Sequence, residues 1–154
     1  MKFFRESLTL AIVAVALFVS GCERGSDVDG GGADEHNMAV TYYTVDGAWQ
    51  LVEWNEAPLA EGTLLYIDLD RKERRFEIWD NFNSMYPTMS SGSFLLSVDD
   101  MDRYIISGWY DYGVGDWNDE YIVELNAEGD SMVWCAVSSD EVMIFAKVEQ
   151  LPEF

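Results

Sequence analysis

The stretch EYIVELNAEGDSMVWCAV, residues 120–137, contains two apolar segments separated by a short polar one. In the first segment, Tyr121, Val123 and Leu125 occupy every second position, and two glutamates lie among the residues between and before them. The middle residues, 126–130, are Asn-Ala-Glu-Gly-Asp, and these types favour tight turns. Apolar residues at every second position are typical of a half-buried β-strand. The stretch therefore predicts two strands joined by a short turn.

The same pattern recurs over the rest of residues 40–154. Short apolar runs, many with period two, are each closed by Asn, Asp, Ser or Gly. Most of the gaps between the runs are four to six residues long, which suits antiparallel hairpins between sequence neighbours. The eight runs are Ala48–Trp54, Thr63–Leu69, Arg75–Trp79, Gly92–Val98, Arg103–Tyr110, Glu120–Leu125, Ser131–Val137 and Val142–Val148.

Eight sequential strands predict an all-β domain, in which an antiparallel up-and-down meander closes into a barrel. Closure removes the exposed edges of the sheet, and a two-sheet β-sandwich is the alternative. A barrel of eight strands has room for packed side chains or for one small ligand. No segment shows a helical apolar stripe, and only residues 83–88 leave room for a short helical turn. Cys135 lies in an apolar run, so burial of its side chain is expected.

The first 22 residues have the layout of a signal peptide. Lys2 and Arg5 form a basic start, and residues 8–19 carry no charge, a run shorter than the roughly 20 apolar residues that span a membrane. The following Val19-Ser20-Gly21-Cys22 resembles the lipobox of bacterial lipoproteins. That resemblance implies cleavage after residue 21 and lipidation of Cys22 with fatty acyl chains such as palmitate. The protein is then expected in the cell envelope, anchored to the outer membrane; an ordinary signal peptide or an uncleaved anchor is the alternative.

Residues 22–39 are predicted to be the lipidated cysteine and a flexible tether, and residues 40–154 the barrel domain. The tether contains Gly30-Gly31-Gly32 and several aspartates without an apolar pattern, which is typical of flexible coil. Residues 22–154 contain 7 basic and 28 acidic residues, a net charge of −21. Such a surface repels nucleic acid, so no nucleic-acid partner is expected.

The first predicted strand opens with Gly47-Ala48-Trp49, which resembles the Gly-x-Trp opening of lipocalin-like domains, in particular those of bacterial lipoproteins of the Bacteroidetes type. The family's Thr-Asp-Tyr turn has only a loose counterpart in Asp119-Glu120-Tyr121. The resemblance implies a barrel whose one end is closed by Trp49. It also implies a basic side chain on the ring of this tryptophan, for which Lys147 in the last predicted strand is the candidate.

Catalytic chemistry that needs histidine is excluded from the predicted domain. The one histidine, His36, lies in the tether, which leaves no Ser-His-Asp or Cys-His arrangement and no histidine-ligated zinc in the barrel. We therefore expect neither an enzyme nor a cofactor; a glycosidase with two facing carboxylates is a remote alternative. The loop at residues 113–120 is rich in side-chain oxygen but lacks a calcium-binding spacing, so no metal is expected there.

The leading functional hypothesis is a membrane-tethered, non-catalytic module that binds a small apolar molecule in the barrel. The alternative is a protein-interaction or inhibitor module with a barrel filled by its own side chains. Tryptophan is common in ligand pockets and in cores alike, and a basic turn at residues 71–75 stands out on an acidic protein. The candidate contacts for a ligand or partner are Trp79, Trp109, Trp117, Arg71 and Arg74.

Overall fold

The computed structural model describes residues 37–154. The predicted signal peptide, Cys22, His36 and most of the predicted tether lie outside the described residues. Within the described part, no helix is both long and apolar enough to cross a membrane.

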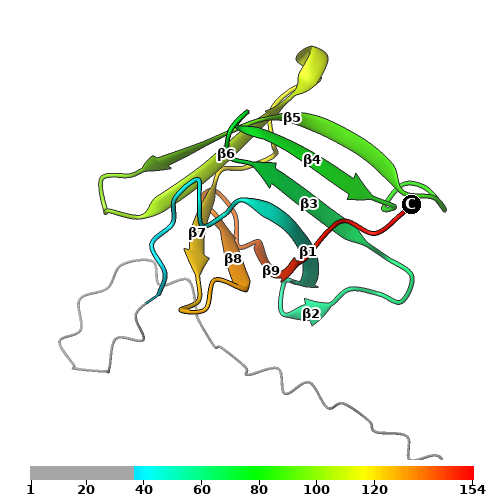
Figure 1. The fold of residues 1–154 in the computed structure, drawn as a ribbon, viewed down its shortest axis with the longest axis horizontal. Coiled ribbons are helices and arrows are strands. Elements are labelled where there is room, and N and C mark those ends of the chain that lie inside the picture. Colours follow the sequence, from blue (N-terminus) through cyan, green and yellow to red (C-terminus); the bar gives the residue numbers. More distant parts are fainter. Residues whose placement is uncertain (1–36) are drawn as a thin grey trace, which may run out of the picture. The chain divides into compact units, whose positions relative to one another are not determined.

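The described residues form a closed antiparallel barrel in which each strand pairs with its neighbours in sequence (Figure 1). Pairing of the first strand with the last closes the barrel, so the predicted up-and-down barrel of eight strands is confirmed and the sandwich is wrong. A short additional strand, β2 (Ala57–Pro58), pairs with the end of β1 (Gly47–Trp54). The strands are β1 (Gly47–Trp54), β2 (Ala57–Pro58), β3 (Leu65–Asp70), β4 (Arg75–Asp80), β5 (Thr88–Val98), β6 (Tyr104–Tyr110), β7 (Tyr121–Leu125), β8 (Ser131–Ala136) and β9 (Val142–Val148).

The short helical turn for which residues 83–88 leave room is not present. Turns and bends occupy residues 82–86, and β5 begins at Thr88, four residues before the apolar run that predicts it. The helical element of the described chain is instead a single 3₁₀ turn, η1 (Asp111–Gly113), directly after β6. The early start of β5 contains Thr, Met and Ser, whose side chains are mostly exposed, so apolar periodicity could not indicate it.

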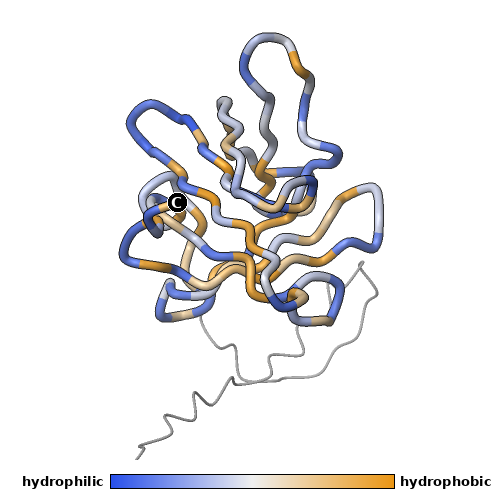
Figure 2. Tube along the Cα trace, turned by 90° about the vertical axis from the view of Figure 1, so that its right-hand side faces the viewer, coloured by the Kyte–Doolittle hydropathy of each residue, from blue (hydrophilic) through white to orange (hydrophobic). Residues whose placement is uncertain are grey.

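The inward positions of the strands build one hydrophobic core. Figure 2 shows hydrophobic residues along the middle of the strands and hydrophilic residues in the loops at their ends. A β-bulge between Leu51 and Glu53 shifts the register of β1 against β9. The largest fully buried side chains are Trp49, Phe76, Phe94, Phe145, Leu51, Ile67, Leu69, Ile106, Leu125, Met132, Val45 and Val123. Cys135 is buried, as its apolar run predicts.

The pairing of β6 with β7 is the shortest in the barrel wall. It comprises two residue pairs, Ile105 with Ile122 and Ile106 with Tyr121. Beyond them the chain folds back on β6, where the Trp117 amide donates to the Gly108 carbonyl at 2.8 Å. The loop between β6 and β7 therefore continues the wall of the barrel without being a regular strand.

Candidate functional site

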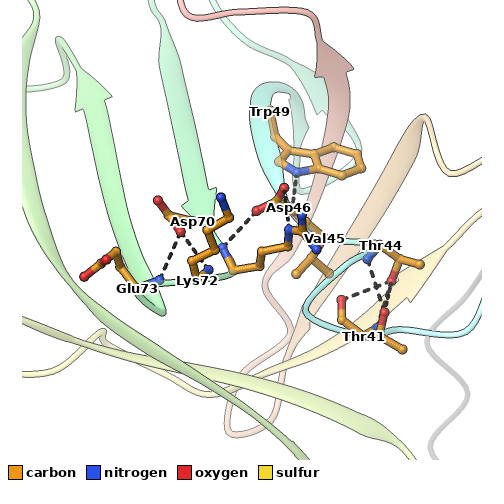
Figure 3. Close-up of polar contacts among 9 residues, drawn as sticks. Thr41, Thr44, Val45, Asp46, Trp49, Asp70, Lys72 and Glu73 are labelled. Atoms are coloured by element: carbon orange, nitrogen blue, oxygen red, sulfur yellow. Dashed lines mark hydrogen bonds and ion pairs between the residues drawn. The ribbon is translucent and has the colours of Figure 1, made fainter.

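Trp49 lies near the start of β1. Its side chain is fully buried, and its indole Nε1 donates to the carbonyl of Val45 at 2.8 Å (Figure 3). Lys147 is its direct partner across the β1–β9 pairing, and the Lys147 Nζ lies 5.0 Å from the centre of the indole. Gly47 has φ of +105°, which favours glycine at the entry to β1. The three residues singled out by the resemblance thus lie together, and the closing role of Trp49 stays a prediction.

The segment before β1 also packs on the barrel. Val40 and Val45 are buried in the core. Thr41 and Thr44 bind each other, the Thr41 amide donating to the Thr44 hydroxyl at 2.8 Å and the Thr44 amide to the Thr41 hydroxyl at 3.2 Å (Figure 3). Between them Tyr42 packs on Phe94 and accepts a hydrogen bond from the Leu96 amide at 3.0 Å. The segment is thus fixed to β5 as well as to β1.

The basic turn between β3 and β4 holds this segment in place. The Arg71 guanidinium lies 4.3 Å from the centre of the Tyr43 ring, and its Nε is 3.4 Å from the Asp46 carboxylate. Arg74 lies 4.8 Å from the centre of the Tyr42 ring. The sequence singles out the two arginines, but their aromatic partners lie some 30 residues earlier in the chain and only the fold brings them together. Arg71 and Arg74, two of the candidate residues for binding a ligand or partner, are therefore bound to side chains of the protein itself.

A shallow depression of about 300 Å³ lies beside this turn, on the outer side of β1 and β3. Asp70 forms part of it and accepts hydrogen bonds from the Lys72 and Glu73 amides (Figure 3), which lower the pKa of Asp70. The pKa of Asp68 is raised, first by partial burial and then by the nearby acidic groups. The depression is lined by Asp46, Gly47, Asp68, Leu69, Asp70, Arg71 and Lys72, a polar set that mixes both signs of charge.

The barrel interior contains a continuous chain of aromatic rings. Phe76 on β4 lies 5.0 Å from Trp117, Trp117 lies 5.3 Å from Trp134 on β8, and Trp134 lies 4.9 Å from Phe145 on β9, measured between ring centres. Tyr121 on β7 packs on the Trp134 ring at 5.4 Å. Side chains from distant strands thus meet across the lumen at this level.

Trp117 differs from the other members because it comes from a loop. Its indole lies over Gly108, where a Cβ atom would be 2.3 Å from the indole Cε2. Only a glycine on β6 leaves room for the ring. The indole N–H groups of Trp117 and Trp134 are buried without a hydrogen-bond partner within the described part of the chain. A buried donor without a partner costs free energy.

Glu141 joins two aromatic side chains where β9 begins. It accepts hydrogen bonds from the Trp54 indole at 2.9 Å and from the Tyr121 hydroxyl at 3.0 Å. Partial burial, followed by the negative charge of Glu141, raises the pKa of Tyr121, so its phenol remains a donor. No sequence motif indicates this triad, whose members are separated by up to 87 residues.

The two remaining candidate tryptophans, Trp79 and Trp109, lie on the outside of the barrel. Trp79 is covered by Phe154, which stacks on it with ring centres 4.8 Å apart. Trp109 on β6 is the most exposed of the six tryptophans, with 45% of its surface accessible. The five candidate residues therefore lie in four places. Trp117 lies in the lumen, Trp79 lies under Phe154, and Trp109 faces solvent. The basic turn contains the other two, Arg71 and Arg74.

The carboxylates of the loop at residues 113–120 do not form a metal-binding group. Asp119 binds the turn between β8 and β9, where it accepts hydrogen bonds from the Ser138 hydroxyl at 2.6 Å and the Ser138 amide at 3.1 Å. Among residues 37–154, no group of three or more acidic, histidine or cysteine side chains is placed to hold a metal ion.

Comparisons of the chain with models of known protein families, with curated proteins and with solved structures give no match. The architecture is that of a lipocalin-like up-and-down barrel, and the function has to be argued from the residues themselves.

Proposed function

We propose that this protein is a non-catalytic interaction module, tethered to a membrane of the cell envelope through Cys22, that contacts its partner with the outside of the barrel. The barrel interior serves as a structural core. The filled barrel and the contact through the outer surface belong to the second of the two hypotheses that the sequence leaves open, and the outer side chains decide the chemistry of the partner.

The observation that carries the proposal is the ring chain through the lumen. Ring contacts, with centres 4.9 to 5.3 Å apart, connect β4 with β8 and β9 through Phe76, Trp117, Trp134 and Phe145. Rings at these separations are in contact, so no space for a ligand lies between them. A large lipid in the lumen would have to displace several of these side chains.

A non-catalytic role is supported by the chemistry of the polar groups. The barrel has no histidine. The carboxylates of Asp111, Asp119 and Glu141 each accept hydrogen bonds from neighbouring side chains. A glycosidase needs two carboxylates free to face the bond that is broken. Carboxylates engaged in this way fix loops and strand ends instead.

A small planar apolar ligand is the second candidate function, and Trp117 is the observation that favours it. The indole is carried by a loop and adjoins the two-residue β6–β7 pairing, and its N–H group has no hydrogen-bond partner among residues 37–154. Displacement of this loop would break few strand hydrogen bonds. It would open an indole-sized space between Phe76, Gly108 and Trp134.

Native mass spectrometry of the full chain, released from detergent micelles, distinguishes the two functions. We expect the native mass to equal the mass after denaturation, because the ring chain leaves no room for a ligand. The Trp117→Ala variant is the matched control, since it creates a cavity that indole can fill. An extra mass that the wild-type protein loses on denaturation would contradict the proposal and support the small-ligand function.

The denatured mass also tests the anchor. We expect the denatured mass to equal that of residues 22–154 plus fatty acyl groups, because two or more acyl chains are needed for stable anchoring. The Cys22→Ala variant should lack the acyl mass and should no longer partition with membranes. A wild-type protein that retains residues 1–21, or that carries no acyl groups, would show that the anchoring proposal is wrong.

A further inference from the structure

The outer faces of β4, β5 and β6 carry one row of side chains. Arg75 pairs directly with Ser93, and Ser93 pairs directly with Trp109. Directly paired residues point to the same face of a sheet. Their sequence neighbours Phe76 and Phe94 point into the core, so this row lies on the outside of the barrel.

The polar part of this row is held rigidly. The Arg75 guanidinium donates from Nη1 to Asp111 Oδ1 at 2.9 Å and from Nη2 to Asp111 Oδ2, and a longer contact of 3.4 Å joins Nη1 to the Ser93 hydroxyl. The Ser91 hydroxyl donates to Asp111 Oδ2 at 2.7 Å. These contacts hold the pKa of Asp111 below its ordinary value, so the pair stays ionised. A two-point pair of this kind fixes both side chains in one plane.

The aromatic part is partly exposed to solvent. Trp109 is 45% exposed, and within the described residues no other aromatic ring stacks on it. Its neighbour on β5 is the small Ser93. At the end of the row, Tyr112 is fully exposed and holds a left-handed φ of +62°. Such a backbone is uncommon for a non-glycine residue and is found more often at ligand-binding positions.

Together, these features favour a neutral ligand that carries hydroxyl and C–H groups. The Arg75–Asp111 pair carries no net charge, which gives no advantage to an anion or a cation. Both groups have more hydrogen-bonding positions than the described contacts use. They can donate to and accept from hydroxyl groups. The face of the Trp109 indole carries partial negative charge and attracts C–H groups.

We propose that Trp109, Arg75, Asp111 and Tyr112 form a binding site for a neutral sugar ring of a glycan. The C–H face of the sugar lies on the Trp109 indole, and its hydroxyl groups bind the Arg75–Asp111 pair. The proposal rests on the proposed function, because it identifies the partner that the outside of the barrel contacts.

Fluorine NMR of the full chain tests the site. The protein is labelled with 5-fluorotryptophan and purified in a detergent without a sugar headgroup. Each of the six tryptophan resonances is assigned by a Trp→Phe variant. Methyl glucoside, methyl galactoside, methyl mannoside and N-acetylglucosamine are the probes, and glucuronic acid is the charged comparison. We expect a neutral glycoside to shift the Trp109 resonance saturably, while the Trp117 and Trp134 resonances stay in place.

Three variants define the site further. Asp111→Asn removes the balance of charge, and Tyr112→Ala removes an exposed ring that the core does not need; we expect each to weaken binding. In Trp109→Ala, followed by the ligand signal in saturation-transfer NMR, binding should weaken about tenfold or more, as for a central tryptophan of an interface. Met89→Ala is the matched control, because Met89 is an exposed residue on the same outer face of β5.

A Trp109 resonance that no neutral glycoside moves, up to the solubility limit of each, overturns the proposal. So does a shift produced by glucuronic acid alone, or an equal loss of binding in Met89→Ala. None of these outcomes changes the native mass, so failure of the glycan site remains distinguishable from failure of the proposed function.

Discussion

Replacement of Trp49 by alanine is expected to lower the free energy of unfolding by about 3–5 kcal/mol, the range for large aromatic side chains in a core. The indole is fully buried near the start of β1. The substitution also leaves the Val45 carbonyl without its 2.8 Å donor and removes the ring under Lys147. Since domains are stable by only about 5–15 kcal/mol, a large part of the stability should be lost. Urea unfolding followed by far-ultraviolet circular dichroism measures the effect.

Two controls separate the contributions. Trp109→Ala makes the same chemical change at an exposed position and should cost less than about 1 kcal/mol, as is usual for surface substitutions. Lys147→Met removes the cation above the ring and retains most of the aliphatic chain, so it should cost about 0.5–1 kcal/mol. If Trp49→Ala were no more destabilising than Trp109→Ala, the Trp49 indole would not have the closing role that the resemblance implies.

Replacement of Gly92 by alanine is expected to destabilise the barrel by about 3 kcal/mol, at the upper end of the range for overpacked cores. A Cβ atom at this position would lie 2.1 Å from the Trp109 carbonyl oxygen and 2.6 Å from Cζ of Phe76. The oxygen belongs to the backbone of β6, which pairs with β5. It cannot retreat without loss of strand pairing. Thermal unfolding of the variant, compared with Ser93→Ala on the same strand, measures the cost.

Gly108→Ala provides the informative contrast. A Cβ atom there would meet the Trp117 indole, a side chain on a loop. We expect the double variant Gly108→Ala, Trp117→Ala to be more stable than the sum of its single changes. Phe76→Leu should not restore Gly92→Ala, because the clash with the Trp109 carbonyl remains. Full restoration by Phe76→Leu would mean that the ring, and not the backbone of β6, limits the space at Gly92.

The positions of the strands could be predicted because each strand has one buried face. Alternation within residues 120–125 and 131–137 predicts β7 and β8 to within one residue. The first four residues of β5 could not be predicted from the same pattern, since they are polar or exposed and pair through their backbone. The shortness of the β6–β7 pairing could not be predicted either, because both segments have the composition of ordinary strands.

The candidate site was predictable only in part, and the reason is again physical. Residue types indicated the tryptophans and the basic turn, but the partners of Arg71, Arg74 and Arg75 are distant in sequence and lie in turns that only the fold brings next to β3 and β4. Likewise, nothing in the sequence of Trp109 and Trp117 distinguishes the exposed ring from the buried one.

The sequence by itself determined the class of fold, the order of the strands and the absence of histidine chemistry from the barrel, because period-two burial and composition are local properties of the chain. Only the tertiary structure decided that aromatic rings meet across the lumen and that Trp109 lies partly exposed beside a neutral ion pair. The first depends on the closure of β1 on β9, which joins residues about 100 positions apart in the sequence. The second depends on the register of β4, β5 and β6.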